Sequence, residues 1–99
     1  MIKIFKTDEF SEWYDAQNEK TRFQIDDRLS KIQYEEHFGV HRFVGTAQAD
    51  VWELKWKNGR RLYYAYIPEK SILILFGGGK NAQQKDIGKA KRLFKKYIE

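Results

Sequence analysis

Apolar and charged residues alternate along 51–57, VWELKWK, with three apolar positions on one side and three charged positions on the other. This period of two is typical of a β-strand with one buried face. Asn58-Gly59 is a turn signal, so RRLYYAYI at 60–67 is predicted to return as the second strand of a hairpin. SILILF at 71–76 is apolar on both faces, which predicts a strand in the middle of a sheet.

Three other segments have apolar residues spaced three or four positions apart, as on one face of a helix. The first follows a short strand at 2–5 and is capped by Thr7 or Asp8. The second begins at Thr21, where Gln24 completes a capping-box pattern. The last runs from near residue 81 to residue 97. The predicted buried stripes are Phe10, Trp13, Tyr14 and Gln17; Ile25, Leu29 and Ile32, with Phe23 and Tyr34 at the edges; and Ile87, Ala90, Phe94 and Tyr97.

These elements follow the order β-α-α-β-β-β-β-α when a brief strand at 41–44 is included in the irregular stretch 37–50. The order predicts a single α+β domain over residues 1–99. Two N-terminal helices and a C-terminal helix would pack with a mostly antiparallel, twisted sheet of four or five strands. We expect the helices to cover one face of that sheet.

The net charge of +5 is concentrated at one end of the chain. Residues 1–79 contain 12 Lys/Arg and 12 Asp/Glu, whereas residues 80–99 contain seven Lys/Arg against Asp86 and Glu99. A concentrated positive charge favours polyanions such as RNA or DNA, or a strongly acidic partner. A solvated, lysine-rich helix face that only maintains solubility is the alternative.

Several classes of protein are disfavoured by composition. The chain has no cysteine, which excludes disulfides and thiolate metal sites and suits a cytoplasmic protein. Its two histidines, His37 and His41, are too few to form a structural zinc site alone. No segment approaches the roughly 18 apolar residues of a membrane helix, and no signal-like start is visible.

The glycine run in LFGGGK, 75–80, raises the question of a phosphate-binding loop. A Walker-type loop needs four residues between its first glycine and Gly-Lys, followed by Ser or Thr, but Asn81 follows Lys80 here. The dinucleotide-binding spacing is also absent. We therefore expect the glycines to let the chain leave a crowded strand with positive φ angles, which leaves Lys80 unexplained.

The segments VWELKWKNGRRLYYAYI and ILILFGGGKNAQQKDIGKAK resemble the RelE/ParE superfamily of bacterial toxins, and most of all its HigB-like "addiction module killer" branch. That branch has a Glu-Leu-Arg strand, a Gly-Tyr-Arg-x-x-Tyr strand and a Gly-Gly-x-Lys-x-x-Gln-x-x-Asp-Ile segment at the start of the last helix. The resemblance covers nearly the whole chain. It implies a RelE-like fold with the element order predicted above.

The resemblance implies the toxin of a type II toxin–antitoxin system, an endoribonuclease that cuts mRNA in the ribosomal A site. A ribose 2′-OH attacks the adjacent phosphate and expels the 5′-oxygen, so no metal or cofactor is needed. The implied partners are the ribosome, its mRNA, and an antitoxin encoded beside the toxin, expected to be a helix-turn-helix DNA-binding protein.

Three cationic residues match the family motifs and are the predicted catalytic residues. Arg61 is expected to clamp the phosphate, because its planar guanidinium suits two phosphate oxygens. Lys55 would contact the same phosphate, or act as a base if the neighbouring cations favour its neutral form. Lys80 would complete the cluster. The residues predicted to bind RNA are Lys57, Arg60, Tyr63, Lys85, Lys89 and Arg92, with the Tyr63 ring able to stack on a base.

The chain departs from its relatives at the general base. Some relatives use a tyrosine in the last helix, where this chain has Asp86-Ile87; Asp86 is a weak candidate for proton transfer on the expected exposed side of the helix. Tyr63, His37, His41 or Tyr97 are the alternatives. Lys55 and Arg61 can also be read as ordinary exposed hairpin residues. On the same fold, a ParE-like inhibitor of DNA gyrase or a non-catalytic RNA- or partner-binding module are competing functions.

The hairpin loop gives a geometric test of the predicted site. A two-residue turn at Asn58-Gly59 would put Lys55 and Arg61 on opposite faces of the sheet. A three-residue loop with Gly59 in a left-handed G1 bulge would instead pair Lys55 with Arg61. We predict the bulge.

Overall fold

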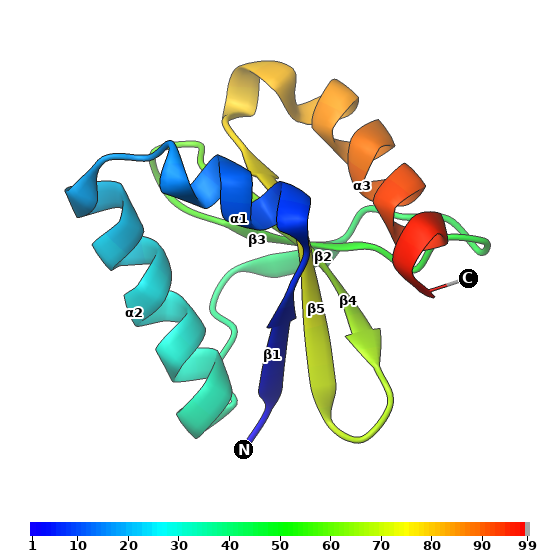
Figure 1. The fold of residues 1–99 in the computed structure, drawn as a ribbon, viewed down its shortest axis with the longest axis horizontal. Helices are drawn as coiled ribbons and strands as arrows, with labels where there is room; N and C mark the ends of the chain where they lie inside the picture. The colour runs from blue at the N-terminus through cyan, green and yellow to red at the C-terminus, as the bar shows by residue number, and fades with distance from the viewer. Residues whose placement is uncertain (99) are drawn as a thin grey trace.

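The computed structural model describes residues 1–98, which form one five-stranded sheet and three α-helices in the predicted order (Figure 1). The strands are β1 (Lys3–Lys6), β2 (His41–Phe43), β3 (Trp52–Lys55), β4 (Arg61–Ile67) and β5 (Ser71–Gly78), and the helices are α1 (Asp8–Asp15), α2 (Glu19–Glu35) and α3 (Gln83–Ile98). The strand order is β1-β5-β4-β3-β2. Only β1, which is parallel to β5, departs from antiparallel pairing. β5 has a neighbour on each side, as its apolar sequence predicts.

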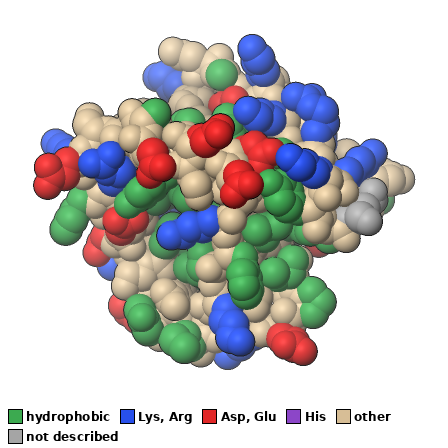
Figure 2. All heavy atoms as spheres, viewed as in Figure 1, with side chains coloured by type: hydrophobic (Ala, Val, Ile, Leu, Met, Phe, Trp, Pro, Cys, Tyr) green, Lys and Arg blue, Asp and Glu red, His purple; other side chains and the backbone are tan. Residues whose placement is uncertain are grey.

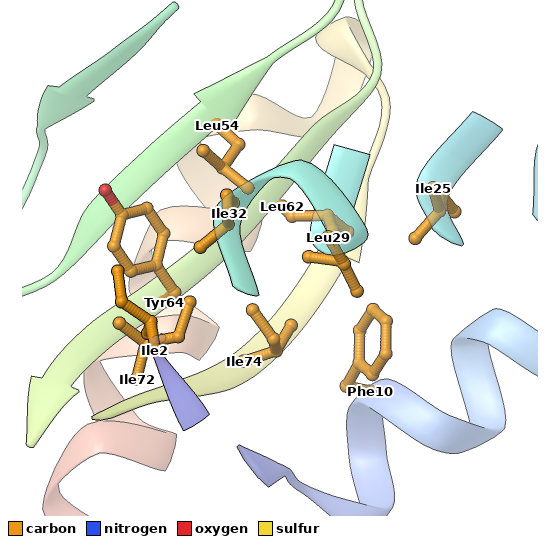
Figure 3. Close-up of a cluster of buried hydrophobic side chains, with 10 residues drawn as sticks. All are labelled: Ile2, Phe10, Ile25, Leu29, Ile32, Leu54, Leu62, Tyr64, Ile72 and Ile74. Atoms are coloured by element: carbon orange, nitrogen blue, oxygen red, sulfur yellow. The ribbon is translucent and has the colours of Figure 1, made fainter. Parts of the chain in front are cut away.

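The helices cover both faces of the sheet, so the expectation that they cover one face is wrong. α1 and α2 enclose one core, which includes Phe10, Ile25, Leu29, Leu62 and Ile74 (Figure 3). On the opposite face, α3 encloses a second core of Ala49, Val51, Tyr63, Ala65, Leu75, Ile87, Ala90 and Leu93. The physical reason lies in β4, where five consecutive residues are buried. Because successive side chains of a strand point to opposite faces of the sheet, both faces of β4 must be covered, and a helical layer lies on each side.

Side-chain caps fix the starts of α1 and α2. The Thr7 hydroxyl accepts the N–H of Phe10 at 2.9 Å and donates to the Leu75 carbonyl at 2.8 Å, which confirms Thr7 as the cap and ties α1 to β5. α2 begins earlier than predicted, because Asn18 is its cap and accepts the N–H of Thr21 at 2.8 Å. Asn is as strong a capping residue as the predicted Thr21, so the first turn of α2 forms directly after Asn18.

Some predicted stripe residues lie outside the core. In α3 the buried residues are Ile87, Ala90 and Leu93, whereas Tyr97 is 40% exposed and its hydroxyl donates to Glu9 of α1 at 2.6 Å. The predicted edge residues of α2, Phe23 and Tyr34, are exposed as well. In residues 1–98, none of the helices has the length and apolar character needed to span a membrane.

Candidate functional site

The β3–β4 hairpin has the predicted three-residue loop between Trp56 and Arg60. The Gly59 N–H donates to the Trp56 carbonyl at 3.0 Å, and the Trp56 N–H donates to the Arg60 carbonyl at 2.9 Å. Gly59 has a φ of +94°, in the left-handed region that glycine adopts without strain. This G1-bulge geometry pairs Lys55 with Arg61, so both side chains leave the same face of the sheet, as predicted.

A fully buried carboxylate lies under this face of the hairpin. Glu53 of β3 is 0% exposed, and one of its oxygens lies 3.4 Å from Nε of Arg61. Its other oxygen accepts from Nε of Arg42 in β2 at 3.2 Å, and Gln83 at the start of α3 donates to Glu53 at 3.0 Å. Glu53 therefore joins β2, β3, β4 and α3 through one charged group.

Arg61, the predicted phosphate clamp, lies beneath the surface. The residue is 7% exposed, its Nη1 donates to the Gly59 carbonyl at 2.9 Å, and its Nε faces Glu53 as an ion pair without hydrogen-bond geometry. The guanidinium thus holds the bulge and the buried carboxylate in place. Lys55, directly opposite Arg61 on the neighbouring strand, is exposed and has no side-chain partner among the described residues.

The glycine run serves close packing. Gly77 and Gly78 are the last two residues of β5, and neither they nor Gly79 have a positive φ, so the prediction of left-handed angles there is wrong. A Cβ at Gly77 would lie 2.5 Å from the Trp13 ring, and a Cβ at Gly78 would lie 1.9 Å from Oδ2 of Asp86. The glycines therefore let α1 and α3 approach β5 from opposite faces.

Lys80 follows these glycines and reaches the hairpin. Its side-chain carbons lie against Gly59, where an added Cβ would meet them at 3.0–3.1 Å. Gly78 is the β5 partner of Arg61, so the end of β5 and the end of the hairpin are adjacent. Lys80 is exposed. The three predicted cations Lys55, Arg61 and Lys80 are thus brought to one end of the sheet, two at the surface and one beneath it.

Asp86 lies between α3 and the end of β5, half-buried, and not on the exposed side of the helix as expected. Burial raises the pKa of this carboxyl, and the nearby Lys89 and Lys85 only partly offset the effect. Burial also raises the pKa of the Tyr63 hydroxyl, and the negative charges of Glu53 and Asp86 add to it. Asp86 is therefore the carboxylate at this site whose proton affinity is raised towards the range useful for proton transfer.

The residues predicted to bind RNA divide between surface and core. Lys57 in the hairpin loop and Lys85 and Arg92 on α3 are exposed; Lys89 is half-buried, with its Nζ 4.0 Å from the centre of the Phe76 ring. Figure 2 shows Lys and Arg side chains gathered over α3 and acidic side chains over α1. These α3 residues and Lys57 can meet a polyanion without rearrangement.

Two residues of that set are placed differently from the prediction. Tyr63 is 0% exposed and packs in the α3 core, so its ring has no face open for stacking on a base. Arg60 lies on the opposite face of the sheet, where its guanidinium donates to Gln24 at 2.9 Å and to Thr21 at 3.3 Å. Residues 60 and 61 diverge because successive side chains of a strand point to opposite faces.

Of the alternative bases, Tyr63 is buried in the α3 core, and the other three lie away from the cationic cluster. His41 contacts the Tyr64 hydroxyl at 2.9 Å and stacks between Phe38 and Trp52 on the α2 face of the sheet. His37 lies beside α2. Tyr97 is bound to α1 at the far end of α3. In the part of the chain that the structure describes, no group of three His, Asp or Glu residues is placed to hold a metal ion.

The chain is similar to known proteins in sequence family and in fold. A family model described as "Phage derived protein Gp49-like (DUF891)" matches residues 12–95. The fold is similar to that of the isolated E. coli RelE toxin, with a TM-score of 0.65 and 14% identity over 89% of this chain and 97% of that one.

Chains from two toxin–antitoxin complexes have a similar fold. For the intact E. coli RelBE toxin–antitoxin complex, the TM-score is 0.59 and the identity is 16% over 80% of this chain and 96% of that one. For the archaeal RelE–RelB complex of Pyrococcus horikoshii, the values are 0.65 and 11%, over 80% and 94% of the two chains. No curated protein shows significant sequence similarity to the chain. The matches confirm the predicted RelE-like fold.

Proposed function

The chain belongs to the family of phage-derived Gp49-like proteins and has a RelE-like fold. From this premise we propose that it is the toxin of a toxin–antitoxin system and that it cleaves mRNA on the ribosome. Its substrate would be a message held in the ribosomal A site. A ribose 2′-OH would attack the adjacent phosphate and break the bond from phosphorus to the 5′-oxygen, and the leaving 5′-oxygen would take up a proton from water. Two similar structures hold a RelE chain together with RelB, and by analogy we propose an antitoxin partner for this chain.

The observation that carries the proposal is the meeting of separate segments at one end of the sheet. The bulge register puts Lys55 opposite Arg61, β5 brings Gly78 to the other side of Arg61, and Lys80 lies against Gly59. Segments that are far apart in the sequence thus place two exposed lysines and one half-buried carboxylate at the same end of the sheet. Cations at fixed positions near a reacting phosphate stabilise the charge that develops on its oxygens.

Each residue of this site has a proposed role. Lys55 and Lys80 contact the phosphate and stabilise the pentacoordinate transition state. Asp86 takes the proton from the 2′-OH, since burial raises the pKa of its carboxyl and so makes the carboxylate a stronger base. Arg61 positions the hairpin from below through Glu53 and the Gly59 carbonyl. The basic face of α3 would bind ribosomal RNA backbone, because lysines at that density give affinity that does not depend on sequence.

Induction of the chain in cells, with mapping of transcript 5′ ends, tests the proposal. Cuts in phase with codons, together with growth arrest, are the expected result. Lys55→Ala and Lys80→Ala should each abolish the cuts while the thermal unfolding midpoint stays unchanged. Lys3→Ala, an exposed lysine on β1, is the matched control and should cut like the wild type.

The same experiment separates the competing functions. DNA breaks without transcript cuts would identify a gyrase inhibitor and overturn the ribonuclease proposal. Growth arrest with neither kind of break would indicate a non-catalytic binding module. If the two lysine variants cut messages at the wild-type rate, the site is wrong even though the activity exists.

A further inference from the structure

A cavity among the described residues lies on the sheet face opposite the cationic site. It is a groove of about 550 Å³ between α2, residues 37–39 and the β3–β4 hairpin. Phe23, Phe38 and Trp56 supply its aromatic lining. Since Trp56 belongs to the α2 face of the hairpin and Lys55 to the α3 face, the groove and the proposed cleavage site lie on different sides of one sheet.

Arg28 lines the groove and holds its walls together. Its guanidinium donates to the carbonyls of Phe38 at 3.0 Å and Val40 at 2.6 Å and also to that of Lys55, and it stacks over the Trp56 ring at 4.4 Å from the ring centre. These bonds fasten the segment after α2 to the hairpin. The groove is therefore formed before any partner binds, which lowers the cost of binding in ordered side chains and loops.

The rim of the groove carries an aromatic residue that the fold does not use. Phe23 of α2 is 72% exposed, although the same helix buries Ile25, Leu29 and Ile32 a few positions on. A large apolar side chain beside a preformed groove marks an interaction site, because its contact area is gained only when a partner covers it. Tyr34, on the same helix and 67% exposed, is not part of the groove lining.

The charges around the groove favour a partner of opposite charge. Three cations line it, Arg28, Lys31 and Lys57, against the single carboxylate of Asp27. Lys31 and Asp27 form an ion pair at 3.2 Å, and Arg28 is bonded to neutral carbonyls, so the groove keeps an excess of positive charge. A complementary occupant combines an apolar anchor with acidic flanking residues.

We propose that this groove docks a segment of the antitoxin, an acidic peptide whose apolar side chain inserts between Phe23 and Trp56. The inference rests on the proposed function in one respect, namely that an antitoxin exists. It adds the place of docking, its chemistry, and the consequence that binding can be weakened without touching the cleavage site.

RNA fits this groove less well than a peptide. The indole of Trp56 already has the Arg28 guanidinium stacked on it, so it is not a bare platform for a base. The exposed cations of the proposed cleavage site, Lys55 and Lys80, lie beyond the hairpin. An apolar anchor meets none of these obstacles.

The test compares Phe23→Glu with the matched control Tyr34→Glu, since both replace an exposed aromatic residue of α2 by the same charge. The binding partner is the product of the gene beside this chain that restores growth, and affinity is measured by calorimetry. Phe23→Glu should weaken binding by about tenfold or more, arrest growth as strongly as the wild type, and escape neutralisation. Tyr34→Glu should bind and be neutralised like the wild type. Lys31→Glu should weaken binding by a smaller factor that shrinks as salt is added.

Each other outcome has a defined meaning. Unchanged antitoxin affinity in Phe23→Glu, with an unchanged unfolding midpoint, overturns the docking site and leaves the proposed function standing. Loss of growth arrest with normal antitoxin binding assigns the groove to RNA and also overturns it. If neither protein encoded by the two genes flanking this one binds the chain, the proposal of an antitoxin partner is refuted. If the antitoxin binds normally but no transcript cuts appear, only the proposed nuclease activity is refuted.

Discussion

Replacing Glu53 by Gln should destabilise the protein strongly although the new side chain is nearly isosteric. The carboxylate is completely buried and faces Arg61 at 3.4 Å, Arg42 at 3.2 Å and Gln83 at 3.0 Å. Arg42 is largely exposed, so water can solvate its charge after the change. Arg61 is not, and its guanidinium would keep the Gly59 carbonyl as its one hydrogen-bond acceptor among the described residues.

The expected loss follows from that asymmetry. Coulomb's law with an effective dielectric constant of about 20 gives roughly 5 kcal/mol of attraction between unit charges at the observed 3.4 Å. Burial of both ions offsets much of this attraction in the folded state, but removing one partner leaves the other uncompensated, at a cost of about 3–5 kcal/mol. The amide retains some hydrogen bonding, so about 3 kcal/mol is expected for Glu53→Gln. For a chain of this size that corresponds to a fall in Tm of about 12–24 °C.

A double-mutant cycle decides whether the pair is the cause. Glu53→Gln, Arg61→Gln and the double variant are unfolded in urea and followed by tryptophan fluorescence. We expect the double variant to be more stable than the sum of the two single losses predicts, by about 2 kcal/mol or more, because neither charge is then left alone. Additive losses, or a Glu53→Gln variant within about 0.5 kcal/mol of the wild type, would refute the buried ion pair as a structural element.

Three further changes test other parts of the molecule. Gly78→Ala should cost about 1–3 kcal/mol in urea unfolding because its Cβ would overlap the Asp86 carboxylate, whereas Gly79→Ala, with nothing within 4 Å, should be neutral; equal losses would contradict the packing role. Asp86→Asn should raise Tm at pH 7, since burial raises the pKa of that carboxyl and ionisation opposes folding, yet slow transcript cleavage by about a hundredfold or more; an active variant would remove Asp86 from the mechanism. Hydrogen bonds from Tyr97 and Lys96 lower the pKa of Glu9 from 4.5 to about 2. The contribution of Glu9 to the free energy of unfolding is therefore fully present above pH 4.5 and is lost as the pH falls through about 2. Glu9→Gln should therefore cost about 1 kcal/mol or less at pH 7 and less at pH 2, where about half of the Glu9 carboxyls are protonated. A Tm difference that is equally large in acid would exclude this linkage.

The hairpin shows what the sequence pattern could determine. The alternation in 51–57 fixed which residues face the core, and only a three-residue loop keeps that alternation in register with 60–67. Asn58-Gly59 supplies the residue that tolerates the left-handed position. Local pattern and turn chemistry therefore led to the correct pairing of Lys55 with Arg61 without any knowledge of the partner elements.

What the pattern could not reveal is the tertiary environment of those side chains. Arg61 reads as an exposed cation because nothing in its neighbourhood along the chain shows that it will be buried beside Glu53. Glu53 reads as a solvent-facing residue for the same reason. Asp86 was expected on the exposed side of α3, but the two glycines at the end of β5 let the helix approach until its carboxyl touches the strand. Burial of these charges depends on contacts between segments distant in sequence, which periodicity does not encode.

The residues that match the RelE/ParE motifs then separate into two groups with different physical roles. Glu53 and Arg61 come from the two hairpin motifs, and the bulge places them as one buried pair; Gly77 and Gly78 permit helix approach. These residues maintain the scaffold, and replacing them should first lower stability. Lys55, Lys80 and Asp86 contribute little to the core, so a loss of cleavage in their variants can be attributed to the site itself. Loss of toxicity in Arg61→Ala alone would therefore not identify a phosphate clamp. The informative variant is Arg61→Gln combined with Glu53→Gln: if its fold is restored and it still cleaves, the guanidinium acts in folding, and if it folds but is inactive, Arg61 also acts on the phosphate.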